Sequence, residues 1–210
     1  MEKFKTVFLV AGIFCFVLSI LVMAVLPWLQ FRNEPIRNVE QLSEKMTMDF
    51  VDLAHRYPDS FKKYYGEVSS KSYAKALKLG HKIYVGEACW HCHSQFVRPV
   101  SNEDKRFGPV SEPLEYHNTL QMPPLFGTRR VGPDLIREAG KRSNDWHAAH
   151  FYQPTNVVPT SVMPNYPWFF DKDGVPNEKG LAIITYVQWL GSWLEDHKTE
   201  VLKPEEKVAA

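Results

Sequence analysis

The sequence predicts a mostly α-helical protein with a single N-terminal transmembrane helix, followed by one helical domain with long loops. Three observations predict this architecture: an uncharged run near the N-terminus, later segments with helical periodicity, and a proline-rich stretch without strand-like alternation. The 210 residues leave room for one domain of ordinary size plus extra segments. Because the net charge is +1 and no basic run is present, nucleic acid is not an expected partner.

The uncharged run extends from Val7 to Trp28. Its length of about 22 residues is enough to cross a hydrocarbon core about 30 Å thick. A cleavable signal peptide would have a shorter apolar part, about 7–15 residues, and a small-residue cleavage site, which the following AVLPWLQFRN does not offer. We therefore expect an uncleaved anchor over residues 7–29 in contact with membrane lipid, preceded by a short N-terminus over residues 1–6. Basic residues flank the run on both sides, so the positive-inside rule gives almost no orientation.

Residues 30–70 are expected to form a linker that is partly helical. Apolar residues recur there at three- and four-residue steps, and Asn38 could cap the resulting helix. Pro58 and Gly66 then break the pattern. The apolar residues of this stripe are Val39, Leu42, Met46, Phe50 and Leu53.

Two further helices are expected in a domain over residues 71–198. The first begins near Ser70 or Ser72 and runs directly into a pair of cysteines. The last lies within residues 177–197, where leucine, isoleucine and valine follow the helical period and aromatic residues add bulk.

Between these helices, residues 94–180 are rich in proline and lack strand-like alternation. Such a stretch cannot build a regular core of its own and normally wraps around something else. The charged segment 199–210 is expected to be disordered.

The segment GEACWHCHSQFVRP contains two of the three cysteines, Cys89 and Cys92, followed at once by His93. The third, Cys15, lies in the expected anchor and reads as a small apolar residue. Zinc would need four ligands, and no second cysteine pair exists outside the anchor, although histidines at 91, 93, 117, 147 and 150 leave a mixed site open. A thioredoxin-like redox pair would follow a strand in a βαβ pattern, whereas a helix precedes this pair.

The spacing C-x-x-C-H is typical of covalent haem c attachment. Each thiol adds to one vinyl group of the macrocycle, and the adjacent imidazole lies under the iron as its proximal ligand. A helix before the motif, a long irregular wrap and a terminal helix together predict a class I cytochrome c-like domain with one covalent haem c. The loops would then pack on the porphyrin. No acid–base constellation is needed for the electron transfer that such a domain performs.

A second axial ligand must come from the wrap. Met163 in SVMPNYPWFF, which lies between Pro159 and Pro164, is the favoured candidate, and Met122 in LQMPPLFG is its rival. Three histidines outside the motif could also bind iron, and an open position is a further alternative. These histidines are His117, His147 and His150.

Haem propionates need cationic partners. The Gly-flanked turn FGTRRVGPDL contains Arg129 and Arg130, whose guanidinium groups suit carboxylates, and Arg98 is a further candidate. The alternative reading is that these arginines are ordinary surface charges.

The motifs CWHCHSQFVRP, KRFG, LFGTRRVGPDL, SNDWHAAH and NVVPTSVMPNYPW, in this order, resemble those of the membrane-anchored mono-haem cytochrome c subunit of cbb-type cytochrome c oxidases. The resemblance covers roughly residues 80–170 and the position of the anchor. It implies that His93 and Met163 are the axial ligands and that the domain lies on the periplasmic side of the inner membrane. It also implies two partners: the catalytic haem–copper subunit that reduces O2, which receives the electrons, and a further cytochrome c subunit.

Two departures accompany the resemblance. Trp90 and His91 are bulky where the family usually has small residues, and residues 32–70 are longer than its usual connection. The alternatives to an oxidase subunit are the haem c subunit of another respiratory complex, similar to that of nitric oxide reductase, and a haem-based sensor. A sensor would leave the sixth coordination position of the iron open or occupied by a labile ligand. An electron carrier with Met–Fe(III) ligation should instead show a weak absorption band at about 695 nm, so this band separates the two alternatives.

Overall fold

A computed structural model describes residues 2–127 and 129–194, and the chain forms two compact units that meet at the Ile36–Arg37 bond. The described residues are mostly helical and contain isolated β-bridges but no strands, which confirms the predicted fold class.

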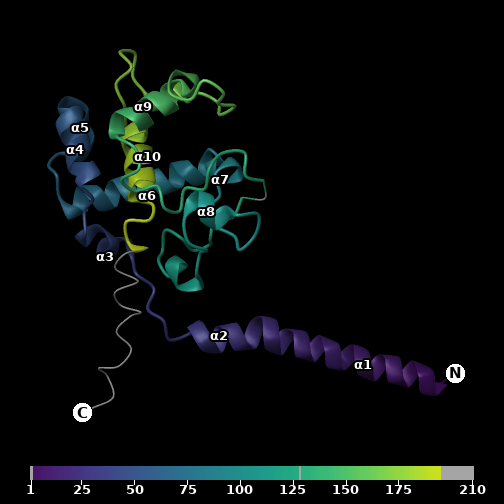
Figure 1. Cartoon of the computed structure of the whole chain (residues 1–210). Coiled ribbons are helices and arrows are strands. Elements are labelled where there is room, and N and C mark those ends of the chain that lie inside the picture. Colours follow the sequence, from purple (N-terminus) through teal and green to yellow (C-terminus); the bar gives the residue numbers. More distant parts are fainter. Residues whose placement is uncertain (1, 128, 195–210) are drawn as a thin grey trace, which may run out of the picture. The chain divides into compact units, whose positions relative to one another are not determined.

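The first unit is one continuous helix near the N-terminus (Figure 1). It consists of α1 (Glu2–Ile20), the π-helical turn η1 (Leu21–Val25) and α2 (Leu26–Phe31). Its 30 residues have a mean hydropathy of 3.0 in their most apolar part, so it is long and apolar enough to cross a membrane. The π-helical turn lies just before Pro27, whose ring lacks an N–H and crowds the carbonyl four residues earlier.

The second unit begins with three short helices: α3 (Val39–Glu44), α4 (Met48–Arg56) and α5 (Pro58–Tyr65). As expected, Asn38 caps the first of them, in a capping box with Gln41. Pro58 does not simply break a helical pattern: it occupies the first position of α5, where a missing N–H costs nothing. The segment expected to link anchor and domain thus contributes side chains to the domain core, namely Val39, Leu42, Phe50, Leu53, Phe61 and Tyr65.

Two long helices, α6 (Ser70–Gly86) and α10 (Glu178–Trp189), pack against each other at the centre of this unit (Figure 1). Gly80 permits the close crossing, because a Cβ atom at this position would lie 2.5 Å from the Cβ of Tyr186. Side-chain caps define both starts: Ser69 for α6 and Asn177 for α10. The helix α6 begins at Ser70, where the sequence predicts its start near Ser70 or Ser72. The crossing buries Tyr84 and Tyr186, whose ring centroids are 5.3 Å apart.

The stretch between the two long helices is irregular, with short helical pieces. These are α7 (Cys89–Cys92), α8 (Glu103–Phe107), η2 (Pro113–Tyr116), α9 (Asn144–Tyr152), η3 (Pro154–Asn156) and η4 (Pro167–Phe169). The helix α9 was not expected in this proline-rich region. It forms because Ser143 accepts a hydrogen bond from the backbone N–H of Trp146 and no proline interrupts the nine residues that follow.

The last helix is shorter than its periodicity predicts. It ends at Trp189. Gly191, two residues later, adopts a φ of 94°, a left-handed conformation that glycine tolerates and that commonly follows the end of a helix. Two expectations lie outside the described residues: that the domain extends over residues 195–198, and that residues 199–210 are disordered.

Candidate functional site

The cysteine pair lies directly after the central helix α6. Ala88, with a positive φ of 56°, turns the chain from α6 into the single turn α7, which contains both thiols. Cys89 is buried and Cys92 is exposed, and both are free. Burial raises the pKa of the Cys89 thiol to about 12, so this thiol is protonated at neutral pH.

The imidazole of His93 is held in one orientation and one tautomer. Its Nδ1 lies 3.0 Å from the carbonyl oxygen of Pro133, and because a carbonyl can only accept, Nδ1–H is the donor. The lone pair of Nε2 is therefore free for a metal ion. Burial lowers the pKa of His93, which favours the neutral form that a metal ligand requires. The Tyr84 hydroxyl fixes the backbone here by donating to the His93 carbonyl at 2.6 Å.

Gly132 completes the cradle of this imidazole. A Cβ atom at Gly132 would lie 2.6 Å from Nδ1 and 2.8 Å from Nε2 of His93, so only glycine fits. The backbone N–H of Gly132 also donates to the Cys92 carbonyl at 3.0 Å. Sequence reasoning assigned this Gly-flanked turn to propionates and missed its contact with His93. The dipeptide Gly132-Pro133 was the sequence signal that could have indicated a tight turn at this place.

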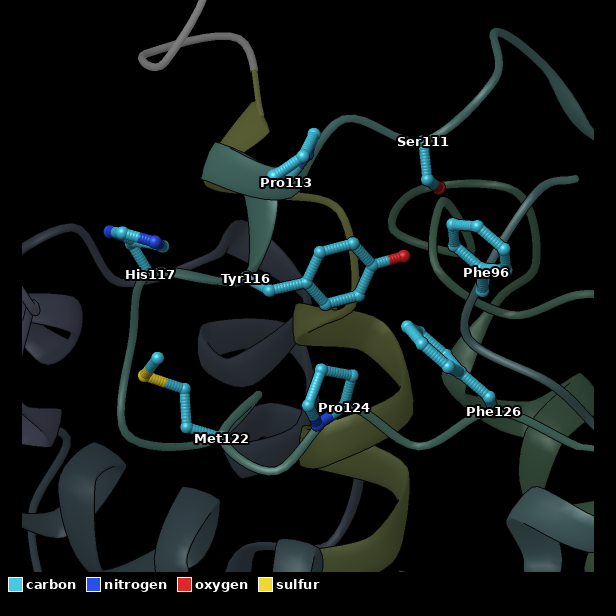
Figure 2. A pocket seen from close by; sticks show the side chains of 8 residues that line it. All are labelled: Phe96, Ser111, Pro113, Tyr116, His117, Met122, Pro124 and Phe126. Carbon is cyan, nitrogen blue, oxygen red and sulfur yellow. The ribbon is translucent and has the colours of Figure 1, made fainter. Parts of the chain in front are cut away.

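The two methionine candidates lie in different surroundings. Met163 is partly buried against the domain core, and its backbone N–H donates to Ser161 Oγ at 3.2 Å. Met122 is 43% exposed and lines a pocket (Figure 2). Figure 2 shows it on the same side of that pocket as His117, with Phe96 and Phe126 on the opposite side.

The other candidate histidines differ in environment. His147 and His150 lie on α9, where burial lowers the pKa of His147 to about 3 and that of His150 to about 4. His91 stacks on Trp90 at 3.8 Å between centroids. Within the described part of the chain, no group of three or more His, Cys, Asp or Glu side chains is arranged to hold a metal ion such as zinc.

The two arginines of the expected propionate site differ in exposure. Arg129 is exposed, whereas the Arg130 side chain is 8% exposed and pairs with Glu103 at 2.7 Å and Asp134 at 3.3 Å. Arg98 lies beside Glu103 at 3.7 Å and donates to the Gly127 carbonyl. Arg130 Nε and Nη1 are buried without a hydrogen-bond partner among the described residues, so they are available to an acceptor such as a carboxylate.

Taken together, these residues fit a covalently attached haem: two free thiols, a neutral imidazole with Nε2 free, and unpaired guanidinium donors. A family model described as "Cytochrome C oxidase, mono-heme subunit/FixO" matches residues 57–200, which is more than half of the chain. The chain belongs to this family.

As a FixO protein it carries one haem and is a subunit of a membrane-associated cytochrome c oxidase, and the resemblance found in the sequence is confirmed. The family match begins at residue 57, so it includes all of α5 and every later helix of the described residues. No curated protein matches the chain significantly.

Proposed function

We propose that this FixO chain binds one haem c covalently and passes electrons to the catalytic haem–copper subunit of its oxidase. The observation that carries the proposal is the position of His93, directly after the Cys89–Cys92 pair, with Nδ1 bonded to Pro133 and Nε2 free. In this proposal Cys89 and Cys92 form the thioethers, and His93 and Met163 are the axial ligands. When bound, haem supplies a one-electron Fe(III)/Fe(II) couple.

The residues of the chain then have separate tasks. The Pro133 carbonyl orients the imidazole of His93 and makes it a stronger electron donor, as hydrogen-bond acceptors beside metal-bound histidines do. Gly132 leaves room for the ring. Arg129, together with the unpaired donors of Arg130, would balance propionate charge.

We further propose that the domain lies on the periplasmic side of the inner membrane, with residues 1–6 in the cytoplasm and 7–29 as the anchor. Attachment requires two free thiols, and in this family maturation takes place outside the cytoplasmic membrane. The proposed partners are the haem–copper subunit as electron acceptor and a further cytochrome c subunit. No step of oxygen reduction is assigned to this chain.

Covalent attachment is tested with the three cysteines. Haem-dependent peroxidase staining of denaturing gels should label the unmodified chain, and acid–acetone extraction should not remove the label. Cys89→Ala and Cys92→Ala should each weaken the stain, because each removes one thioether, and the double variant should abolish it. Cys15→Ala is the matched control and should stain normally. A haem that acid–acetone extracts cleanly from the unmodified chain would contradict the proposal.

A further inference from the structure

A buried ionic cluster lies next to the His93 cradle and consists of Glu103, Arg130 and Asp134. Arg130 Nη2 lies 2.7 Å from Glu103 Oε2 and 3.3 Å from Asp134 Oδ2, and it donates to the Phe96 carbonyl at 2.8 Å. The three side chains are 9% exposed or less, and the Phe107 ring lies 4.9 Å from the guanidinium carbon of Arg130. Charges removed from water in this way are stable only when they are paired and hydrogen-bonded.

The cluster connects two backbone segments that meet at His93. On the first segment, Asp134 Oδ2 accepts from the N–H of Phe96 at 2.8 Å, and Glu103 Oε2 accepts from the N–H of Arg98 at 2.8 Å. On the second, Asp134 Oδ1 accepts from the N–H of Ile136 at 2.9 Å. The first segment follows His93 directly, and the second contains Gly132 and Pro133, which contact its ring.

We infer that Glu103 is a positioning residue for the axial histidine, an inference that rests on the proposed haem site. Within the described part of the chain, the hydrogen bonds and ion pairs of the Glu103 side chain go to Arg98 and Arg130, and none goes to His93 or the cysteines. Its carboxylate holds Arg130 and the backbone of Arg98, and the cluster keeps the Pro133 carbonyl at hydrogen-bonding distance from Nδ1 of His93. Nothing in the sequence pattern alone assigns a role to this glutamate.

Loosening the cluster has a definite expected direction at the iron. A weaker hydrogen bond from Nδ1–H to Pro133 makes the imidazole a poorer electron donor, which destabilises Fe(III) relative to Fe(II). The midpoint potential should therefore rise. The electron paramagnetic resonance g values of the ferric protein should change as well, because they report the field of the axial ligands.

The test uses two cluster variants and one matched control in the full-length, detergent-purified protein. Glu103→Gln removes the charge and keeps the shape, and Arg130→Lys keeps the charge but loses the guanidinium fork. The control is Glu115→Gln: Glu115 is 8% exposed, against 7% for Glu103, and pairs with Arg137 at the same 2.7 Å. A propionate contact of Arg130 would not alter the axial field, so the g values separate positioning from propionate binding.

We expect both cluster variants to retain stainable haem and to change the g values. The equilibrium between Fe(III) and Fe(II) should shift about tenfold toward Fe(II), which is a rise of about 59 mV in the midpoint potential of a one-electron couple. Glu115→Gln should leave the g values unchanged. Unchanged g values in either haem-bearing cluster variant, or an equal change in Glu115→Gln, would overturn the inference. Loss of haem from the cluster variants would also overturn it, since a positioning residue acts on a ligand that stays bound. Absence of covalent haem from the unmodified chain would instead show that the proposed function has failed.

Discussion

Met163 and Met122 both precede a proline, yet their surroundings differ at the level of single side chains. Met163 packs partly buried against the domain core, where a thioether can be shielded from water. Met122 is 43% exposed in the pocket of Figure 2, beside His117. The two environments favour Met163 as the methionine that binds iron.

Exchanging the ligand at position 163 should change the potential and leave haem attachment intact. A thioether is a soft ligand that favours Fe(II), so His/Met ligation gives a higher potential than bis-histidine ligation. We expect Met163→His to lower the midpoint by about 100 mV, which is worth roughly 2.3 kcal/mol at 59 mV per tenfold change. A redox titration followed in the visible spectrum measures the shift.

Met122→His is the matched control for this exchange. It should barely change the midpoint potential, and the weak absorption band at about 695 nm should persist, because Met122 is expected to contact its pocket and not the iron. If Met122→His abolishes that band while Met163→His preserves it, Met122 is the ligand and the proposed alignment of this segment with the family is wrong.

At the residue scale, the sequence predicted the parts of the site that depend on local spacing. Cys89, Cys92 and His93 are adjacent in the chain, so their grouping required no knowledge of the fold. The contact of Pro133 with His93 joins positions 40 residues apart, and it depends on an irregular loop whose path no periodicity defines. The proposed role of Glu103 could not be predicted from the sequence for the same reason.

At the element scale, the crossing of α6 and α10 depends on one missing side chain. The Cβ atom that Gly80→Ala adds would lie 2.5 Å from the Cβ of Tyr186, so the two helices must move apart. We expect this variant to lower the free energy of unfolding by about 2 kcal/mol, the usual cost of overpacking a tight core. Guanidinium unfolding followed by far-ultraviolet circular dichroism measures the loss.

Gly86→Ala, on the same helix, controls for the change in backbone propensity. No atom lies within 4 Å of a Cβ at Gly86, so this variant should be as stable as the unmodified protein or slightly more stable. Equal stability of Gly80→Ala and Gly86→Ala would show that the crossing is not limited by close approach at Gly80.

Helix α9 carries a histidine that makes stability depend on pH. His147 is 3% exposed, and burial lowers its pKa to about 3. Between the unfolded pKa of about 6.5 and the folded pKa, the unfolded chain binds the proton and the folded chain does not, so stability falls as pH falls. Through this one group, the free energy of unfolding should be about 2 kcal/mol lower at pH 5 than at pH 7, at about 1.4 kcal/mol per pKa unit.

The variant His147→Gln should lack this loss of unfolding free energy. Guanidinium unfolding of the variant and of the unmodified protein at pH 7 and pH 5 measures the difference. His55, which is exposed on α4, provides the control: His55→Gln should leave the slope unchanged. A full 2 kcal/mol loss persisting in His147→Gln would mean that other groups cause the acid sensitivity.

Helix prediction succeeded where periodicity and a cap agreed, as at Asn38, and failed where a proline was given the wrong meaning. Pro58 starts α5, and the proline-rich wrap hides α9. The first error arises because proline disrupts the interior of a helix but is compatible with its first turn, and the second because α9 lies between prolines and contains none. The sequence alone does not show which of the two positions a proline occupies.

At the scale of the whole molecule, the sequence predicts an anchor and a domain, and the chain has two compact units with their boundary after Ile36. Residues 32–36, between the end of α2 and this boundary, are exposed. The segment 37–65, expected in a linker, supplies core residues, because its apolar stripe faces α6 and α10 rather than water. Amphipathicity predicted these helices but not the surface on which they pack.

The exposed connection between the units allows a direct test of the proposed orientation. A recognition sequence for a site-specific protease, inserted between Asn33 and Glu34, should be cut when the protease is added to spheroplasts, since the domain is proposed to be periplasmic. Cleavage should release a soluble, haem-staining fragment, because the second unit begins at Arg37 and has its own core. The same insertion should be protected in inverted membrane vesicles.

The matched control carries the recognition sequence at the N-terminus, before Lys3, on the opposite side of the apolar run. It should be resistant in spheroplasts and cut in inverted vesicles, because an uncleaved span of about 22 apolar residues separates the two positions by the hydrocarbon core. The reverse pattern at both positions would overturn the proposed periplasmic location of the domain. Cleavage of both insertions from the same side would show instead that residues 7–29 do not span the membrane.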